Sequence, residues 1–255
     1  MQYLGGKSRT RNQIAAYLNR IRKPDQPYWE PFVGAGWVLE KVKGQPIYAS
    51  DANEALIFMW QRLQQGWQPP KVVTEEMYQQ AKAGELPSQE VAFIGFACSY
   101  SGKWFAGYAR GEDRNYATEG YNRLLKTVNR LDSVHFFTAN FLECYIPAYG
   151  CLIYCDPPYE DTTAYGALPP FDSAKFWQRV RWLEGHGHTV IVSEYQAPPD
   201  FSCVVEMPTK TDMHTRNGKD HRIERLFRLG EHQLLQPSLL GGDLPLFALD
   251  SVKDS

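Results

Sequence analysis

The chain of 255 residues carries 27 lysines and arginines against 29 aspartates and glutamates, which gives a formal net charge of -2. Its hydrophobic content of 43% is enough for a packed core, in one large domain or in one domain with an insertion. No apolar run approaches the roughly 20 residues that span a bilayer, and the N-terminal segment has no apolar signal core. We therefore expect a soluble cytoplasmic protein with no membrane partner.

The cysteines and histidines do not form the patterns of a metal site. The five cysteines are an odd number and lack C-x-x-C pairs, so free and mostly buried thiols are expected. His186 and His188 are close in sequence, but no matching cluster accompanies them, and a surface turn after a helix explains them equally well. We expect no metal.

Charge is unevenly distributed along the chain. Residues 1–23 hold only basic charged side chains, and residues 103–130 and 210–228 are also rich in lysine and arginine. Such segments suit contacts with phosphates if the fold gathers them on one face. For any one segment, a solvated helix face explains the charges as well.

Two strand and helix units open the chain after a first helix. Residues 8–22 are expected to be helical, with Ser8 as the N-cap. A strand ending near Phe32 is followed by a glycine turn at 34–36 and a helix that begins around Trp37. IYASDANEALIFMWQRL repeats this order, with its loop at residues 51–53.

The middle of the chain interrupts this alternation. Residues 64–132 mix proline, glycine, aromatic and basic residues, which indicates an insertion. Strands then return at VHFFTANF, GCLIYCD and HTVIVSEY, with a helix, SAKFWQRVRWLEG, between the last two, whereas RIERLFRL fits a strand or a helix. These patterns predict an α/β fold, a mostly parallel sheet with helices on both faces. Residues 1–63 and 133–230 would form its main domain, 64–132 an inserted subdomain, and 231–255 a flexible tail.

Three polar or flexible features are expected at the carboxyl edge of this sheet, where open parallel sheets bind ligands. Gly34 and Gly36 follow the first strand, Asp51 the second and Asp156 a later one. A glycine turn allows close backbone approach, and an acid after the next strand can accept both hydroxyls of a ribose. The pattern favours a nucleoside cofactor, although G-A-G lacks the full G-x-G-x-x-G spacing and also fits a helix-start turn.

The DPPY segment at 156–159 is a more specific indication of function than the glycine turn. Pro158 keeps Pro157 extended, so the Pro157 carbonyl and the Asp156 carboxylate form two acceptors on a rigid bend. Two acceptors suit an exocyclic amine, and Tyr159 suits stacking on the base that carries it. The alternative is a rigid turn after a buried strand, with Tyr159 packed inward.

Taken in order, YLGGK at 3–7, EPFVGAG at 30–36, SDANEAL at 50–56 and YCDPPY at 154–159 resemble the DNA adenine-N6 methyltransferases of the Dam type, the D12 class. The similarity covers most of residues 1–230. It implies a class I methyltransferase-like fold, S-adenosylmethionine as cofactor, a DNA-recognition insertion and double-stranded DNA as partner, in a nucleoid-associated cytoplasmic enzyme. It also implies methyl transfer to N6 of a flipped adenine. The alternatives are another nucleobase amine, cytosine N4 or an RNA base, and a catalytically inactive DNA-binding relative.

The resemblance assigns site residues. The catalytic residues would be Asp156, Pro157 and Tyr159, and the cofactor-binding residues Tyr3, Lys7, Phe32, Gly34, Gly36, Asp51, Asn140 and Asp156. Arg222 and Glu224 occupy matching positions in the closing block. Two positions depart from the family pattern: Trp37 replaces a small residue after the glycine loop, and Asn140 replaces an aspartate that reads the adenine of the cofactor. An amide both donates and accepts, so recognition of the cofactor is expected to differ there.

DNA contacts are expected from interleaved aromatic and basic residues. The candidates are Lys103, Trp104, Tyr108, Arg110, Arg114, Arg123, Lys126, Arg216 and Lys219. A small satellite core could use the same aromatic residues. Near the end of the chain, Asp243 to Phe247 resemble the peptide that bacterial replication proteins insert into the sliding clamp, although Asp243 replaces the usual glutamine. A tail that packs on the protein itself fits equally well.

Overall fold

The computed structural model describes residues 7–111, 113–158, 171–215 and 218–235, and in residues 209–222 the backbone alone. Several predicted site residues therefore lie outside the described part. These are Tyr3, Tyr159, Arg216, the side chains of Lys219 and Arg222, and the segment from Asp243 to Phe247. Among the described residues, no helix combines the length and the apolar character that a membrane span requires.

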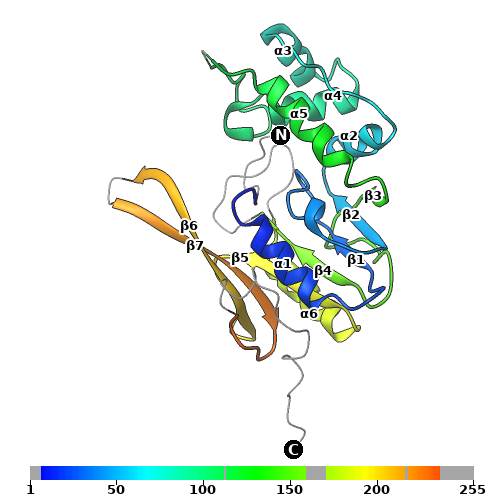
Figure 1. The fold of residues 1–255 in the computed structure, drawn as a ribbon, viewed down its shortest axis with the longest axis vertical. Coiled ribbons are helices and arrows are strands. Elements are labelled where there is room, and N and C mark those ends of the chain that lie inside the picture. Colours follow the sequence, from blue (N-terminus) through cyan, green and yellow to red (C-terminus); the bar gives the residue numbers. More distant parts are fainter. Residues whose placement is uncertain (1–6, 112, 159–170, 216–217, 236–255) are drawn as a thin grey trace, which may run out of the picture.

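A seven-stranded sheet with the order β3-β2-β1-β4-β5-β7-β6 organises the fold (Figure 1). The strands are β1 (Tyr28–Glu30), β2 (Ile47–Asp51), β3 (Val134–Thr138), β4 (Leu152–Cys155), β5 (Thr189–Glu194), β6 (Phe201–Thr215) and β7 (Gly218–Leu229). The first five are parallel, β7 pairs antiparallel with β5, and β6 pairs antiparallel with β7. The predicted mostly parallel sheet is confirmed, and RIERLFRL is a strand.

Helices cover both faces of the sheet, as predicted. Trp29 and Ile153 belong to a buried cluster with residues of α6 (Ser173–Gly185). Their neighbours along the strands, Tyr28 and Tyr154, belong to a second buried cluster with α1 (Arg11–Ile21) and α2 (Glu54–Gln64). Successive strand residues point to opposite faces, so these short apolar strands supply two cores at once.

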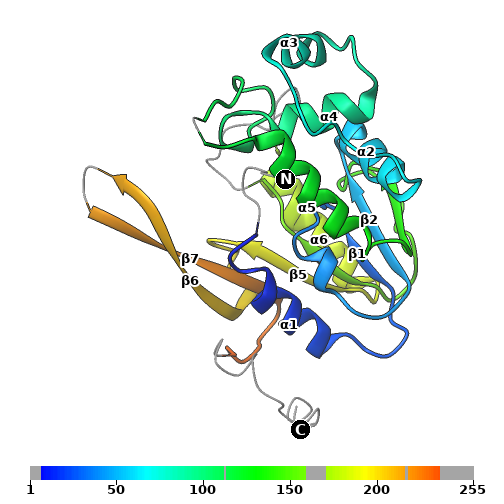
Figure 2. The same ribbon diagram turned by 45° about the horizontal axis from the view of Figure 1, so that its top comes forward.

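The segment predicted as an insertion is helical in the structure. It contains α3 (Glu75–Ala83), α4 (Ser88–Ala97), the 3-10 turn η2 (Tyr100–Gly102) and α5 (Tyr116–Val128). Figure 2 shows α3, α4 and α5 gathered at one end of the molecule, away from the β6–β7 hairpin. Phe93 and Leu124 of this layer share a buried cluster with Leu56 and Trp60 of α2. The helical layer therefore packs directly against α2 and shares its hydrophobic core.

Two local expectations need correction. The helix expected from Trp37 is only the single 3-10 turn η1 (Leu39–Lys41), because Val42 is already extended at φ -73° and ψ 136°. The first helix begins at Arg11, and its N-cap is Thr10, which makes no side-chain cap, rather than Ser8.

Candidate active site

One edge of the sheet gathers the predicted site. The loop with Gly34 and Gly36 follows β1, Asp51 ends β2, Asp156 follows β4 and Glu194 ends β5. The four strands are parallel neighbours, so their carboxyl ends meet at the same edge. The structure thus brings the predicted glycine loop and the two predicted acids to one side of the sheet.

Lys7 joins Asp156 to a second acid from the far end of the chain. Its Nζ lies 2.8 Å from Asp156 Oδ1 and 3.1 Å from Glu224 Oε1, and the Lys7 side chain is only 6% exposed. Ser193 Oγ also donates to Glu224 Oε1, at 2.5 Å. Because both carboxylates are mostly buried, the shared ammonium offsets much of the cost of their desolvation.

The burial of this network shifts its proton equilibria. Burial raises the pKa of Asp156 to about 6, against the opposing effect of the Lys7 ammonium and with a further rise from Glu224. Burial likewise raises the pKa of Glu194 to about 7. For Lys7, burial favours the neutral amine, but Asp156 and Glu224 outweigh it and raise the pKa above its ordinary value. Lys7 is therefore charged at neutral pH, and Asp156 is mainly ionised there.

Two acids at this edge did not emerge from the sequence as site residues. Glu30 is buried and accepts a hydrogen bond of 2.9 Å from Tyr28 Oη, and burial raises its pKa well above the ordinary value. Glu194 accepts from its neighbour Tyr195 N at 2.8 Å. Both end a parallel strand, so the rule that pointed to Asp51 and Asp156 would have included them.

The glycine loop and Asp51 are bound to each other. Gly34 (φ 46°) and Gly36 (φ 64°) adopt the left-handed conformation that glycine tolerates best. Asp51 accepts Gly34 N at 3.2 Å and Asn53 N at 3.0 Å, and burial raises its pKa to about 6 although these backbone donors oppose the rise. Trp60 Nε1 donates to Gly34 O at 3.0 Å from the other side. Hydrogen bonds to Asp51 and from Trp60 thus fix the position of Gly34 in the loop.

Phe32 and Asn140 make mainly structural contacts. Phe32 packs on the rings of Phe141, Phe171 and Phe176, with centroids 5.2 to 6.0 Å away. Asn140 is exposed, and its Oδ1 accepts Leu142 N at 3.1 Å, which closes its own turn.

The candidate DNA-binding residues divide into packed and exposed groups. Trp104 packs on Phe96 and Phe105, and Tyr108 Oη donates to Val73 O at 2.6 Å. Arg110 and Arg114 form exposed ion pairs with Glu75 and Glu119, and such pairs contribute little to stability. Arg123 reaches the buried Glu40, Lys103 is half-buried and Lys126 is exposed.

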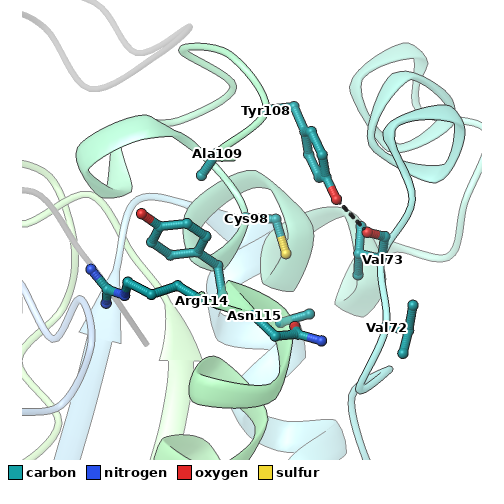
Figure 3. Close-up of a pocket in the computed structure, with 9 residues that line it drawn as sticks. Val72, Val73, Cys98, Tyr108, Ala109, Arg114 and Asn115 are labelled. Atoms are coloured by element: carbon teal, nitrogen blue, oxygen red, sulfur yellow. Dashed lines mark hydrogen bonds between the residues drawn. The ribbon is translucent and has the colours of Figure 1, made fainter. Parts of the chain in front are cut away.

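A pocket in the helical layer is separate from the sheet edge (Figure 3). Its lining comes from residues 72–73, 98, 108–109 and 114–117, and includes neither the glycine loop nor Asp156. The hydrogen bond from Tyr108 to Val73 holds the Tyr108 ring at this pocket, and Cys98 is another of its lining residues. Burial raises the pKa of Cys98 to about 12, so its thiol stays protonated at neutral pH.

The cysteines and the two histidines have structural surroundings. All five thiols are free, and the described residues contain no group of three metal-ligating side chains. His188 is buried and its Nδ1 accepts Cys151 N at 3.1 Å, so the surface turn expected for both histidines is wrong for His188.

Solved structures with a related fold include TrmN from Thermus thermophilus (14% identity, TM-score 0.39, 87% of this chain and 48% of that chain). The 23S rRNA methyltransferase ErmE follows at 12% identity and TM-score 0.41, over 91% of this chain and 72% of that chain. The rRNA methyltransferase aviRa from Streptomyces viridochromogenes has 12% identity and TM-score 0.39, over 89% of this chain and 86% of that chain. This chain spans about half the length of TrmN. Proteins this distant in sequence and structure can act on different substrates.

A search of curated proteins found no match. The sequence model of the D12 class N6 adenine-specific DNA methyltransferase family matches residues 3–96. This stretch contains Lys7, the glycine loop and Asp51 and ends before Asp156. The match agrees with the resemblance that the motifs indicated: residues 3–96, less than half of the chain, match the D12 class N6 adenine-specific DNA methyltransferase family, within an α/β fold that has a mostly parallel sheet.

Proposed function

We infer that the protein transfers a methyl group from S-adenosylmethionine to N6 of an adenine flipped out of double-stranded DNA. The observation that carries this proposal is the position of Asp156, mostly buried at the carboxyl end of β4, one strand away from the glycine loop and ion-paired with Lys7. The family match over residues 3–96 supports the choice of adenine and DNA.

The residues of the edge fit the cofactor. Gly34 and Gly36 hold the positive φ angles of 46° and 64° that let the loop turn at the end of β1, and a Cβ at Gly36 would point at Trp60, 3.4 Å away. Asp51 lies at the end of the adjacent strand, where its carboxylate can accept the two hydroxyls of a ribose. When bound, S-adenosylmethionine supplies a sulfonium methyl group that is open to nucleophilic attack.

Asp156 and Pro157 would activate the target amine. The N6 lone pair of adenine is delocalised into the ring, so the nitrogen is a poor nucleophile. Acceptors that hold its hydrogens favour a more tetrahedral nitrogen, and the Asp156 carboxylate and the Pro157 carbonyl offer two of them. A covalent enzyme intermediate is not required, and burial keeps the neighbouring thiol of Cys155 protonated by raising its pKa well above the ordinary value.

The helical layer would bind the DNA around the target. Extruding a base costs a few kcal/mol, which phosphate contacts and stacking offset. Lys103 and Lys126 lie at or near the surface of this layer and would contact phosphates, and Arg110 would do so by exchanging its exposed pair with Glu75. Trp104 and Tyr108 also serve the packing of the layer. We therefore assign residues 64–132 to target recognition, and residues 1–63 and 133–230 to catalysis. The sliding-clamp segment, Asp243 to Phe247, has no support from the comparisons and is not part of this proposal.

The proposal is tested by incubating the purified protein with S-adenosylmethionine and DNA of diverse sequence, followed by mass spectrometry of the nucleosides. We expect N6-methyladenine, and its absence across all sequences would overturn the assignment. N4-methylcytosine, or methylation of RNA alone, would favour the alternative substrates. Calorimetry with S-adenosylmethionine separates an active enzyme from an inactive DNA-binding relative, which need not retain the cofactor site.

A further inference from the structure

A buried carboxylate lies at the junction between the helical layer and the glycine loop. Glu40 of η1 has no exposed side-chain surface, and its Oε1 lies 2.8 Å from Arg123 Nη2 of α5. Thr127 Oγ1, also of α5, donates to Glu40 Oε2 at 3.3 Å. Arg11 and Arg130 complete the shell at 3.8 and 3.7 Å. One carboxylate is thus surrounded by three guanidinium groups, from α1, from α5 and from the second residue after α5.

Trp37 joins this cluster to the glycine loop. It follows Gly36 directly, and the guanidinium carbons of Arg123 and Arg11 lie 3.8 and 4.7 Å from its ring centroid. Such guanidinium stacking on tryptophan is attractive, and more so when partly desolvated. Arg123 therefore touches both Glu40 and Trp37, and the tryptophan that departs from the family pattern is the platform for an α5 side chain.

The same helical layer reaches the glycine loop by a second route. Leu124 and Val128 of α5 share the buried cluster of α2, and Trp60 of α2 donates to Gly34 O at 3.0 Å. Gly120 brings α5 so close to α4 that an added Cβ would lie 2.9 Å from Ala97 Cβ. A movement of α5 would thus change the contacts of both ends of the loop, Gly34 through Trp60 and Gly36 through Trp37.

We propose that Glu40 and Arg123 are positioning residues that couple DNA binding by the helical layer to cofactor binding at the glycine loop. The inference rests on the proposed function, because it requires both ligands. Without the Glu40 carboxylate, three guanidinium groups repel one another and Arg123 loses the partner that holds it over Trp37. Energetic coupling between two sites is reciprocal, so it can be measured from either ligand.

The test compares the affinity of the unreactive product S-adenosylhomocysteine with and without a DNA duplex that the wild-type protein methylates. We expect wild-type protein to bind it at least about fivefold more tightly in the presence of the duplex. In Glu40→Gln and in Arg123→Lys the ratio should fall below about twofold, with affinity in the absence of DNA changed far less. Arg123→Lys keeps the positive charge but lacks the planar guanidinium, which stacks on Trp37 and at the same time hydrogen-bonds to Glu40. This variant therefore remains informative if Glu40→Gln fails to fold.

Asp200→Asn provides a matched control, because it removes an exposed ion pair with Arg181 of α6, outside the helical layer. In this variant, the DNA duplex should increase the affinity for S-adenosylhomocysteine by the same factor as in the wild-type protein. A wild-type ratio near one, or variants that keep the wild-type ratio, would overturn the coupling while leaving methyl transfer intact. If the wild-type protein bound no S-adenosylhomocysteine and methylated no DNA, the proposed function would fail and the coupling with it.

Discussion

Lys7 Nζ contacts Asp156 Oδ1 at 2.8 Å, so the start of the chain completes a site whose acid follows the fourth strand. The same ammonium lies 3.1 Å from Glu224 of β7, which anchors it in the antiparallel part of the sheet. A buried carboxylate without such a partner would favour its protonated form. Lys7 thus keeps Asp156 ionised, the state in which it can accept hydrogens from an amine.

The dependence of methyl transfer on pH should follow the protonation of Asp156. Burial raises the pKa of Asp156 to about 6, so the folded protein takes up a proton there as pH falls through about 6, and the protonated acid loses its acceptor role. We expect kcat/KM to fall below about pH 6, rather than near 4 as for an exposed aspartate. In Lys7→Met the opposing charge is gone, so the midpoint should move to higher pH. Profiles of both proteins that coincide near pH 4 would contradict this account.

Asp156→Asn should impair catalysis more than folding. The amide oxygen is uncharged and therefore a weaker acceptor than the carboxylate, so it polarises the amine hydrogen less and no longer pairs with the Lys7 ammonium. We expect kcat to fall on the order of 100-fold to 1,000-fold, the range for losing one preorganised polar group. Glu206→Gln, which removes the partly exposed pair with Arg225 on β6 and β7, is the control and should retain activity. A near-normal kcat in Asp156→Asn would refute the assigned role.

Asp51→Asn should weaken cofactor binding with little effect on the chemical step. Its carboxylate accepts Gly34 N and Asn53 N and would accept the ribose hydroxyls as well. Charge-assisted hydrogen bonds contribute about 1.5–3 kcal/mol, so the Kd of S-adenosylmethionine should rise roughly 10-fold to 100-fold. At saturating cofactor, kcat should be nearly unchanged, because the lost hydrogen bonds stabilise the bound cofactor equally before and during methyl transfer. Calorimetry and steady-state kinetics test the two halves; an unaltered Kd would exclude Asp51 from the cofactor site.

The sheet and its ligand edge could be predicted because they follow from local patterns. Short apolar strands that end in glycine or an acid recur along the chain, and parallel pairing brings those ends together. The partners of Asp156 could not be predicted, since Lys7, which precedes α1, and Glu224 of β7 are far from it in the sequence and meet it only in the folded chain. The same holds for Trp37, whose contacts with Arg11 and Arg123 come from two other elements.

The sequence of the insertion fits two different structures. Aromatic residues beside basic ones fit both DNA stacking and a satellite core, and only tertiary structure shows that Trp104 lies against Phe96 and over Gly95. Glu30 and Glu194 show the opposite case. They end strands at the predicted edge, but Glu30 opens the EPFVGAG segment, in which the glycines indicate the function, and Glu194 ends an apolar strand, so neither carboxylate is distinguished by the sequence pattern.

Gly36→Ala should destabilise the protein about as much as Gly84→Ala, but only Gly36→Ala should weaken S-adenosylmethionine binding. Both glycines have positive φ, 64° and 76°, so alanine costs about 1–2 kcal/mol of backbone strain at either position. At Gly36 the new Cβ would lie 3.4 Å from Trp60, an ordinary van der Waals contact, and at Gly84, the C-cap of α3, no heavy atom lies within 4 Å, so neither position adds a clash. Chemical denaturation should give similar losses of stability for the two variants, and calorimetry should show weaker cofactor binding only for Gly36→Ala. Equal effects on cofactor affinity would show that the loop geometry is not used.

Lys126→Ala should weaken DNA binding by the same factor for every sequence. Lys126 is exposed on α5, in the layer assigned to target recognition. A lysine that neutralises one phosphate releases counterions on binding, so its loss should reduce the slope of log Kobs against log salt by about one. Lys175→Ala is the matched control, since Lys175 is 71% exposed on α6 at another part of the fold, and it should leave the slope unchanged. Titrations over a range of salt concentrations measure both slopes. If the two variants keep the wild-type slope, Lys126 does not contact the DNA backbone, and the phosphate contacts must come from other residues of the chain.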